Sequence, residues 1–171
     1  MRCAYQLLGS CAVGVNGDYA FDSSFGAAWE QRWNAQDKKG ITFATLVEFS
    51  VLYKGDNRRI DGTIIIVLAH TIASDTAYLN LGAASENGLD SQWSTNAVLG
   101  WKHPSKSGKS AIVADAVFAP NGGRRLELSW QSSMGSSPWT VGPGVGFDVG
   151  DGPSDWNAGV VFQYTFDTKE N

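Results

Sequence analysis

The chain has 171 residues and a mass of 18.3 kDa, a size that fits one domain and excludes an enzyme with separate cofactor and substrate lobes. Charged residues make up 18% of the chain, beside 20 Gly and 7 Trp, so it is neither a disordered acidic chain nor a coiled coil. The net charge is −4 and the 13 Lys and Arg residues are scattered along the sequence, which argues against nucleic acid as a partner.

The spacing of the turn residues predicts hairpins rather than helices. Clusters of Gly, Pro, Asn, Asp and Ser recur at short intervals, for example at residues 54–57, 120–123 and 150–155. The segments between them alternate apolar and polar residues, which is the period of a β-strand. The longest apolar runs are far shorter than the roughly 18 residues that a helix needs to span a bilayer, whereas a barrel strand needs only about 9 to 11.

The N-terminal third is the noisiest part of the pattern. Residues 1–24 are either an extra strand, over residues 3–15, or the remnant of a leader. In the next segment Phe25, Trp29 and Trp33 recur at every fourth position, as on a helix, but Ala27 completes an odd-numbered apolar row opposite Glu30. We therefore expect a strand over residues 25–33. Residues 41–53, 63–68 and 77–83 alternate as well.

The C-terminal half alternates most cleanly. Residues 156–166 place Trp156, Val160 and Phe162 on one face and Asn157 and Gln163 on the other. The same sorting recurs over residues 93–101, 110–118, 124–133 and 139–149. With eight clear strands and about ten in total, the sequence predicts an all-β fold, an antiparallel up-and-down (meander) barrel that forms one domain over residues 1–171.

Two features favour a transmembrane barrel with its apolar face outside. The first is that aromatic residues lie at the ends of the apolar rows. About eight residues of strand, tilted by about 40°, leave about 20 Å between such rings, close to the apolar band of about 25 Å that aromatic girdles flank in membrane barrels. The predicted girdle consists of Trp93, Trp101, Phe118, Trp130, Trp139, Phe147, Trp156, Tyr164 and Phe166.

The second feature is the composition of the polar face. It is rich in Gly, Ser, Asn and Gln and carries a few charges of both signs, whereas a soluble outer surface usually carries more Lys and Glu. Small and amphoteric side chains suit a wet lumen, and Asp115, Arg125 and Glu127 could pair there across neighbouring strands. The predicted lumen lining consists of Tyr78, Asn80, Asn96, Asp115, Arg125, Glu127, Asp148 and Gln163.

The end of the last strand adds a resemblance. Residues 161–166 read Val-Phe-Gln-Tyr-Thr-Phe, which is similar to the C-terminal signature of bacterial outer-membrane barrels, although five residues follow the final Phe. The chain also resembles, over residues 25–33, 41–56, 78–82 and 158–166, the outer-membrane transporter-like barrels associated with degradation of aromatic compounds, the phenol meta-pathway MetA-like family. The resemblance implies an outer-membrane location in a Gram-negative bacterium. It also implies about twelve strands, so that a first hairpin would be missing here.

Catalytic and metal-binding patterns are weak. His70 falls on the apolar row near Ser74 and Asp75, which invites comparison with outer-membrane lipid hydrolases, but these two residues lie in a turn. Residues 107–110 read Ser-Gly-Lys-Ser without the upstream Gly and the following helix that a phosphate-binding loop needs. We expect no enzyme, no cofactor and no metal site.

The sequence therefore predicts a passive pore or transporter-like channel for small solutes, aromatic or hydrophobic ones included. Membrane lipid or detergent would surround it, and its oligomeric state is left open. Two alternatives remain. One is a soluble barrel of lipocalin or avidin type that binds a small hydrophobic ligand on an inward apolar row. The other is an outer-membrane lipid-modifying enzyme that uses His70. The direction in which the apolar row points decides between the first alternative and a membrane barrel.

Overall fold

The structure, a computed structural model, describes residues 2–16, 18–33, 41–54, 57–85, 92–119, 122–149 and 156–167. Every regular element in these ranges is a β-strand. A search of the same ranges for a helix both long and apolar enough to cross a membrane finds none.

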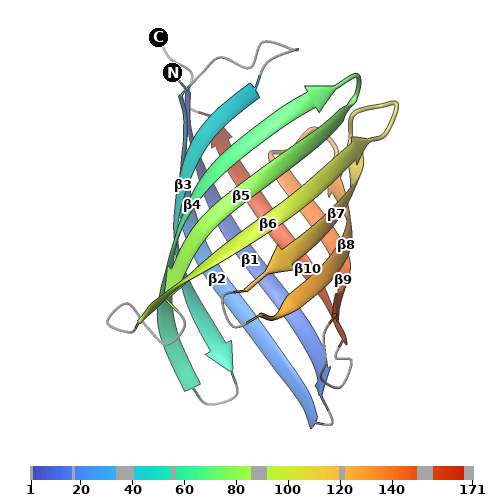
Figure 1. Cartoon of the computed structure of the whole chain (residues 1–171). Helices are drawn as coiled ribbons and strands as arrows, with labels where there is room; N and C mark the ends of the chain where they lie inside the picture. The colour runs from blue at the N-terminus through green and yellow to red at the C-terminus, as the bar shows by residue number, and fades with distance from the viewer. Residues whose placement is uncertain are drawn as a thin grey trace.

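Ten strands in the described ranges form one antiparallel meander that closes on itself (Figure 1). Each strand pairs with its neighbours in the chain, and the first pairs with the last. The predicted fold class is confirmed. In chain order the strands are β1 (Arg2–Asn16), β2 (Asp18–Arg32), β3 (Ile41–Lys54), β4 (Asn57–Ile72), β5 (Asp75–Ser85), β6 (Trp93–Pro104), β7 (Ser110–Phe118), β8 (Arg124–Ser133), β9 (Trp139–Asp148) and β10 (Trp156–Asp167).

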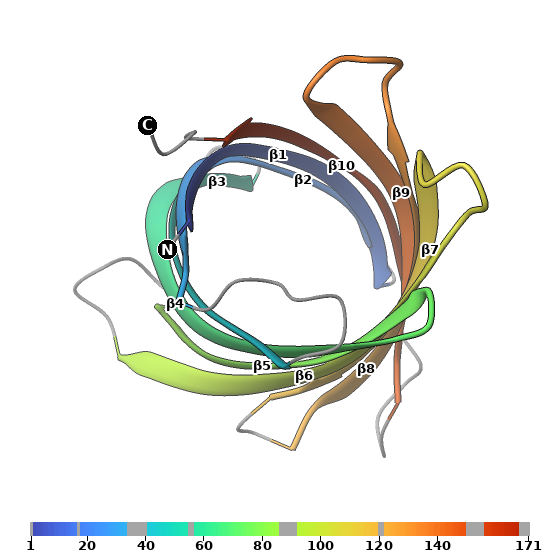
Figure 2. The same cartoon turned by 90° about the horizontal axis from the view of Figure 1, so that it is seen from above.

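The N-terminal segment supplies the strands that close the barrel. β1 pairs with β10 along its length, from Ala4 opposite Asp167 to Val15 opposite Trp156, and with β2 on its other side. The view along the axis shows the strands as a ring (Figure 2). Residues 25–33, which the apolar spacing left open between helix and strand, belong mostly to β2. Closure pairs both edges of the sheet, so the described strands leave no free edge.

The strands are longer than the alternating segments of the sequence. β4 has 16 residues, whereas only residues 63–68 alternate clearly. The additional residues at both ends are polar or mixed, and they extend the strand because their backbone groups bond to β3 and β5. Side-chain alternation therefore marks the middle of each strand, while backbone pairing determines its ends.

The two ends of the barrel differ in what they carry. Both termini lie at one end, together with the connections from β4 to β5, β6 to β7 and β8 to β9 (Figure 1). We call this the terminal end. Two of these connections turn at a glycine with positive φ, Gly108 at 69° and Gly135 at 65°. Glycine suits these positions because it has no Cβ to clash in the left-handed region.

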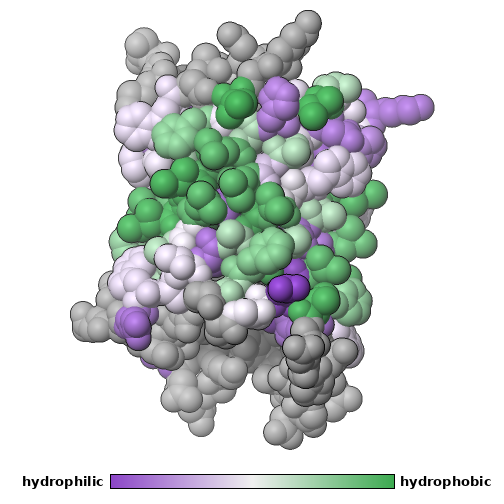
Figure 3. Space-filling model, in the orientation of Figure 1, coloured by the Kyte–Doolittle hydropathy of each residue, from purple (hydrophilic) through white to green (hydrophobic). Residues whose placement is uncertain are grey.

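The apolar face of the sheet points outward. Leu99, Leu126 and Leu128 are each more than half exposed, at 53%, 53% and 51%. The buried hydrophobic residues among those described are small ones, Ala28, Ala44, Ala111 and Val113, so no large apolar side chain packs a centre. On the face shown in Figure 3, apolar side chains form a band across the middle of the outer surface. The alternative of a soluble barrel with an inward apolar row is wrong, because such a band exposed to water would be strongly unfavourable.

Candidate functional site: the inner face of the barrel

The inner face is organised in rows of directly opposed residues, which share a side of the sheet. One row runs across six strands from β5 to β10. Tyr78 opposes Gly100, Gly100 opposes Asp115, and Asp115 opposes Glu127. The row continues through Gly146 and ends at Asn157. We call these six residues the Tyr78 row: Tyr78, Gly100, Asp115, Glu127, Gly146 and Asn157.

A hydrogen bond crosses this row. Tyr78 Oη donates to Asp115 Oδ1 at 2.5 Å. Gly100 lies between the two residues, and a Cβ there would overlap the tyrosine ring and contact Asp115 Oδ1. The absence of a side chain at Gly100 is what allows the ring to lie flat along the wall and reach two strands away.

An ion pair lies in the neighbouring row. Arg125 on β8 donates from Nε to Asp148 Oδ1 at 2.6 Å and from Nη2 to Asp148 Oδ2 at 3.4 Å. This fork is the bidentate geometry that favours Arg with carboxylates. Glu127 is a more distant partner, with its Oε1 3.9 Å from Arg125 Nη1. One guanidinium therefore serves two carboxylates, and it binds Asp148 more closely.

Further polar groups extend this wall toward the terminal end. Lys102 Nζ on β6 donates to Gln131 Oε1 on β8 at 3.3 Å. Thr140 opposes Gln163 in the pair of β9 and β10. The predicted lining did not include Lys102, Gln131, Thr140 or Asn157. The last three lie on polar faces that the sequence pattern identified, whereas Lys102 lies one residue beyond the alternating segment 93–101.

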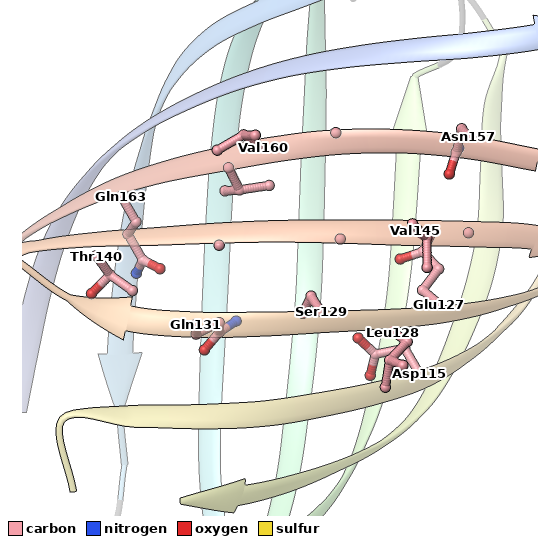
Figure 4. Close-up of a pocket in the computed structure, with 15 residues that line it drawn as sticks. Asp115, Glu127, Leu128, Ser129, Gln131, Thr140, Val145, Asn157, Val160 and Gln163 are labelled. Carbon is pink, nitrogen blue, oxygen red and sulfur yellow. The ribbon is translucent and has the colours of Figure 1, made fainter. Parts of the chain in front are cut away.

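A cavity of about 330 Å³ lies against this wall. Glycines of β9 and β10 form part of its lining, namely Gly142, Gly144, Gly146 and Gly159. Because these positions carry no side chains, they leave room that larger residues would occupy. Figure 4 shows the polar side chains around this space. Those that border it are Asp115, Glu127, Ser129, Gln131, Thr140, Asn157 and Gln163.

The opposite wall, built from β2 to β4, mixes apolar and charged side chains. Register places Ile65 in the row of Gly82, and Val67 in the row of Asn80 and Val98. Acidic groups occur here too: Glu48 opposes Thr63, and Glu30 accepts a hydrogen bond of 2.6 Å from Arg32 Nε. The inner face is thus amphipathic, with a polar wall facing a mixed one.

The eight residues predicted to line the lumen all fall on the rows of this inner face. Five of them contact one another, Tyr78 with Asp115, and Arg125 with Asp148 and Glu127, while Gln163 borders the cavity. Asn96 Oδ1 lies where a Cβ of Gly82 would be. Asn80 Oδ1 is buried and has no hydrogen-bond partner among the described residues. Whether solutes pass these side chains is a proposal, taken up below.

The predicted girdle residues lie on the outer face, near the two ends of the strands. Trp101, Trp130, Trp139 and Tyr164 are toward the terminal end, and the Trp139 and Tyr164 rings meet edge to face at 5.0 Å. Trp93, Phe118, Phe147 and Trp156 are toward the other end, with Phe147 opposite Trp156. The side chain of Phe166 lies outside the described residues. Trp33 at the end of β2 is also exposed, at 51%, and joins the terminal-end set.

A polar cluster at the outer rim was not foreseen. Asp75 Oδ1 lies 2.6 Å from His103 Nδ1, and Asp75 Oδ2 accepts a hydrogen bond of 3.1 Å from Trp101 Nε1. The Trp101 and His103 rings stack at 5.5 Å. The acid that adjoins His70 in the prediction thus pairs with a different histidine. His70 itself is exposed, and it has no hydrogen-bond partner in the part of the chain that the structure describes.

Metal ligands do not gather in the described ranges. No group of three or more His, Cys, Asp or Glu residues there is arranged to hold a metal ion. Two further aspartates, at positions 151 and 155 in the turn cluster over residues 150–155, lie outside the described residues.

Comparisons with known proteins bear on the fold. No protein-family model matches the chain, and no curated protein matches it. An outer membrane channel from Pseudomonas putida F1 aligns with a TM-score of 0.54 and 10% identity, over 96% of this chain and 95% of that one. The KdgM porin, solved in complex with disordered oligogalacturonate, aligns with a TM-score of 0.50 and 10% identity, over 97% and 99%.

Larger barrels align less well. OpdK from Pseudomonas aeruginosa gives a TM-score of 0.43 at 11% identity. The alignment covers 94% of this chain but only 56% of OpdK. This chain therefore spans little more than half the length of that protein. At such identities the likenesses show the fold alone, and the fold is that of outer-membrane β-barrels.

Proposed function

We propose that the chain, as a single domain, forms a passive pore or transporter-like channel in the outer membrane of a Gram-negative bacterium. The observation that carries the proposal is the sorting of its surfaces. A closed barrel presents exposed Leu and Ile rows outside and a charged, amide-rich wall with a cavity inside. This is the arrangement of a barrel whose outer face contacts lipid and whose interior is wet.

The number of strands and the glycines of the inner face support a path rather than a filled core. An eight-stranded barrel has an interior that side chains can fill, while barrels of 16 to 18 strands leave an open aqueous channel. With ten strands in the described ranges, this barrel is near the lower limit. The glycines at 142, 144, 146 and 159 create space there, so the side of the lumen formed by β9 and β10 is the proposed route.

The amphipathic lumen suits small solutes that carry both apolar and polar groups. Ile65 and Val67 line one wall, and Gln131 and Gln163 line the other. The Tyr78 ring lies along the Tyr78 row, where its hydroxyl bonds to Asp115. An aromatic ring with hydroxyl or carboxyl substituents could contact both walls at once. Such solutes fit the resemblance to barrels associated with aromatic degradation, and the membership of that family is part of this proposal.

Reconstitution tests the proposed function. The chain, refolded in detergent, should migrate as a compact species on a gel until boiled, as closed barrels do when their hydrogen bonds survive the detergent. In planar bilayers it should produce discrete conductance steps, and vesicles that contain it should swell in small solutes but not in large oligosaccharides. Ready purification in plain buffer, or bilayers that stay silent with folded protein, would contradict the proposal.

A further inference from the structure

The charges on the inner face do not balance. The polar wall of β5 to β10 carries Asp115, Glu127 and Asp148 against Lys102 and Arg125. On the opposite wall, register places three further carboxylates on the same inner face, Glu30, Glu48 and Asp61, against one cation among the side chains that the structure describes there, Arg32. The described inner face therefore has an excess of carboxylates, and a lumen lined by one sign of charge concentrates ions of the other sign.

The contacts indicate which carboxylate acts on passing ions. Asp148 is neutralised by the bidentate fork of Arg125, at 2.6 Å and 3.4 Å. Asp115 is covered by the Tyr78 hydroxyl on Oδ1. Among the described residues, the ion-pair contact of Glu127 is the one at 3.9 Å with Arg125, and its side chain is 42% exposed. It also borders the cavity.

Glu127 directly opposes Asp115 in the pair of β7 and β8. Like charges in directly opposed positions repel each other. Nothing on these two strands compensates the pair except the arginine that Asp148 already binds. A mobile cation in the adjoining cavity would relieve this repulsion, whereas an anion would add to it.

We propose that the channel prefers cations, and that Glu127 is the residue that sets this preference. The inference rests on the proposed function, because it concerns what passes through the same lumen. A unit charge about 7 Å from an ion in water changes the local concentration of a monovalent ion about threefold. Removal of the Glu127 charge should therefore lower the ratio of K⁺ to Cl⁻ permeability by about threefold or more.

The test measures reversal potentials of the full chain in planar bilayers with a KCl gradient. The parent channel should have the sign of a cation-preferring pore, and Glu127→Gln should move the potential toward zero. Arg125→Gln, which removes the only close counter-charge, should move it the other way. Asp75→Asn is the matched control, because it removes the same charge from the outer rim, where Asp75 pairs with His103, and it should change nothing.

The outcomes separate the two proposals. Folded protein without conductance would overturn the pore itself and the inference with it. A conducting channel with no cation preference, or one whose preference is equal in Glu127→Gln and the parent, would overturn the inference and leave the pore intact. If Glu127→Gln does not fold, Arg125→Gln still tests the inference through the direction of its shift in reversal potential. A shift toward anion preference, or no shift, would contradict the role of these charges.

Discussion

Tyr78 and Asp115 are 37 residues apart in the chain, yet the tyrosine hydroxyl donates a 2.5 Å hydrogen bond to the carboxylate over the bare backbone of Gly100. The bond ties β5 to β7 across the strand that separates them. It also holds an aromatic ring against the wall rather than across the lumen. Three of the predictions below concern this inner face, and one concerns the closure of the barrel.

Gly100→Ala should displace the Tyr78 ring, because the new Cβ would overlap ring atoms and contact Asp115. Overpacking of this kind costs about 1–3 kcal/mol, and the displaced ring should lower the single-channel conductance. Gly142→Ala is the matched control, since the nearest atom to its Cβ would be 3.5 Å away, an ordinary contact. Urea unfolding from lipid vesicles measures the free energy; equal losses in both variants would show that the ring does not depend on Gly100.

Tyr78→Phe should remove the hydrogen bond and keep the ring. A hydrogen bond to a charged group contributes about 1.5–3 kcal/mol, and the half-exposed setting of this one places the expected loss at the lower end of that range. A double-mutant cycle with Asp115→Asn isolates the interaction from other effects of each substitution. A coupling free energy indistinguishable from zero would mean that the two groups do not interact in the membrane.

Leu128→Arg and Ser129→Arg should differ sharply, although the residues are neighbours. Leu128 is exposed on the outer face, and Ser129 borders the inner cavity. An arginine on the lipid face near the bilayer midplane costs about 2–4 kcal/mol, whereas a substitution in the lumen changes selectivity. We expect poor folding of Leu128→Arg in vesicles and a well-folded, less cation-preferring Ser129→Arg. The reverse pattern would mean that the faces are exchanged.

Val160→Cys should form a disulfide with the native Cys11. The two positions are register partners in the pair of β1 and β10, and directly opposed positions fall within the Cα separation of about 4.4–6.8 Å that disulfides require. The chain should carry Cys3→Ser to leave one native thiol. Mild oxidation should then give a crosslinked, faster-migrating band after denaturation. Val161→Cys, which lies opposite Ser10, is the control and should not crosslink. A crosslink from this position to Cys11 instead would show that the register of β1 and β10 is shifted by one residue.

The sequence predicted the strands because alternation is a local property. In β8 each residue of Leu126, Leu128 and Trp130 is exposed outside while its neighbours face inward, as the pattern indicated. The prediction of a strand rather than a helix over residues 25–33 is confirmed; it depended on Ala27, which completes an apolar row of period two. The ends of β4 were missed because backbone pairing extends a strand past the residues whose side chains alternate.

The inner site was only half predictable. Polar residue types marked its lining, but the choice of partner depends on register, which no single strand contains. Arg125 was expected among acids, and its close contact is with Asp148 rather than Glu127. The rim cluster was not predicted, because Asp75 and His103 lie on different strands, 28 residues apart in the chain.

The amino-acid sequence by itself determined which residues share a face, because successive side chains of a strand point to opposite sides of the sheet whatever the neighbours are. Only the tertiary structure decided which face points outward, which strands pair to close the barrel and which inward side chains contact each other. Those relations depend on the register between strands far apart in the chain, where a shift of one residue would exchange inside and outside.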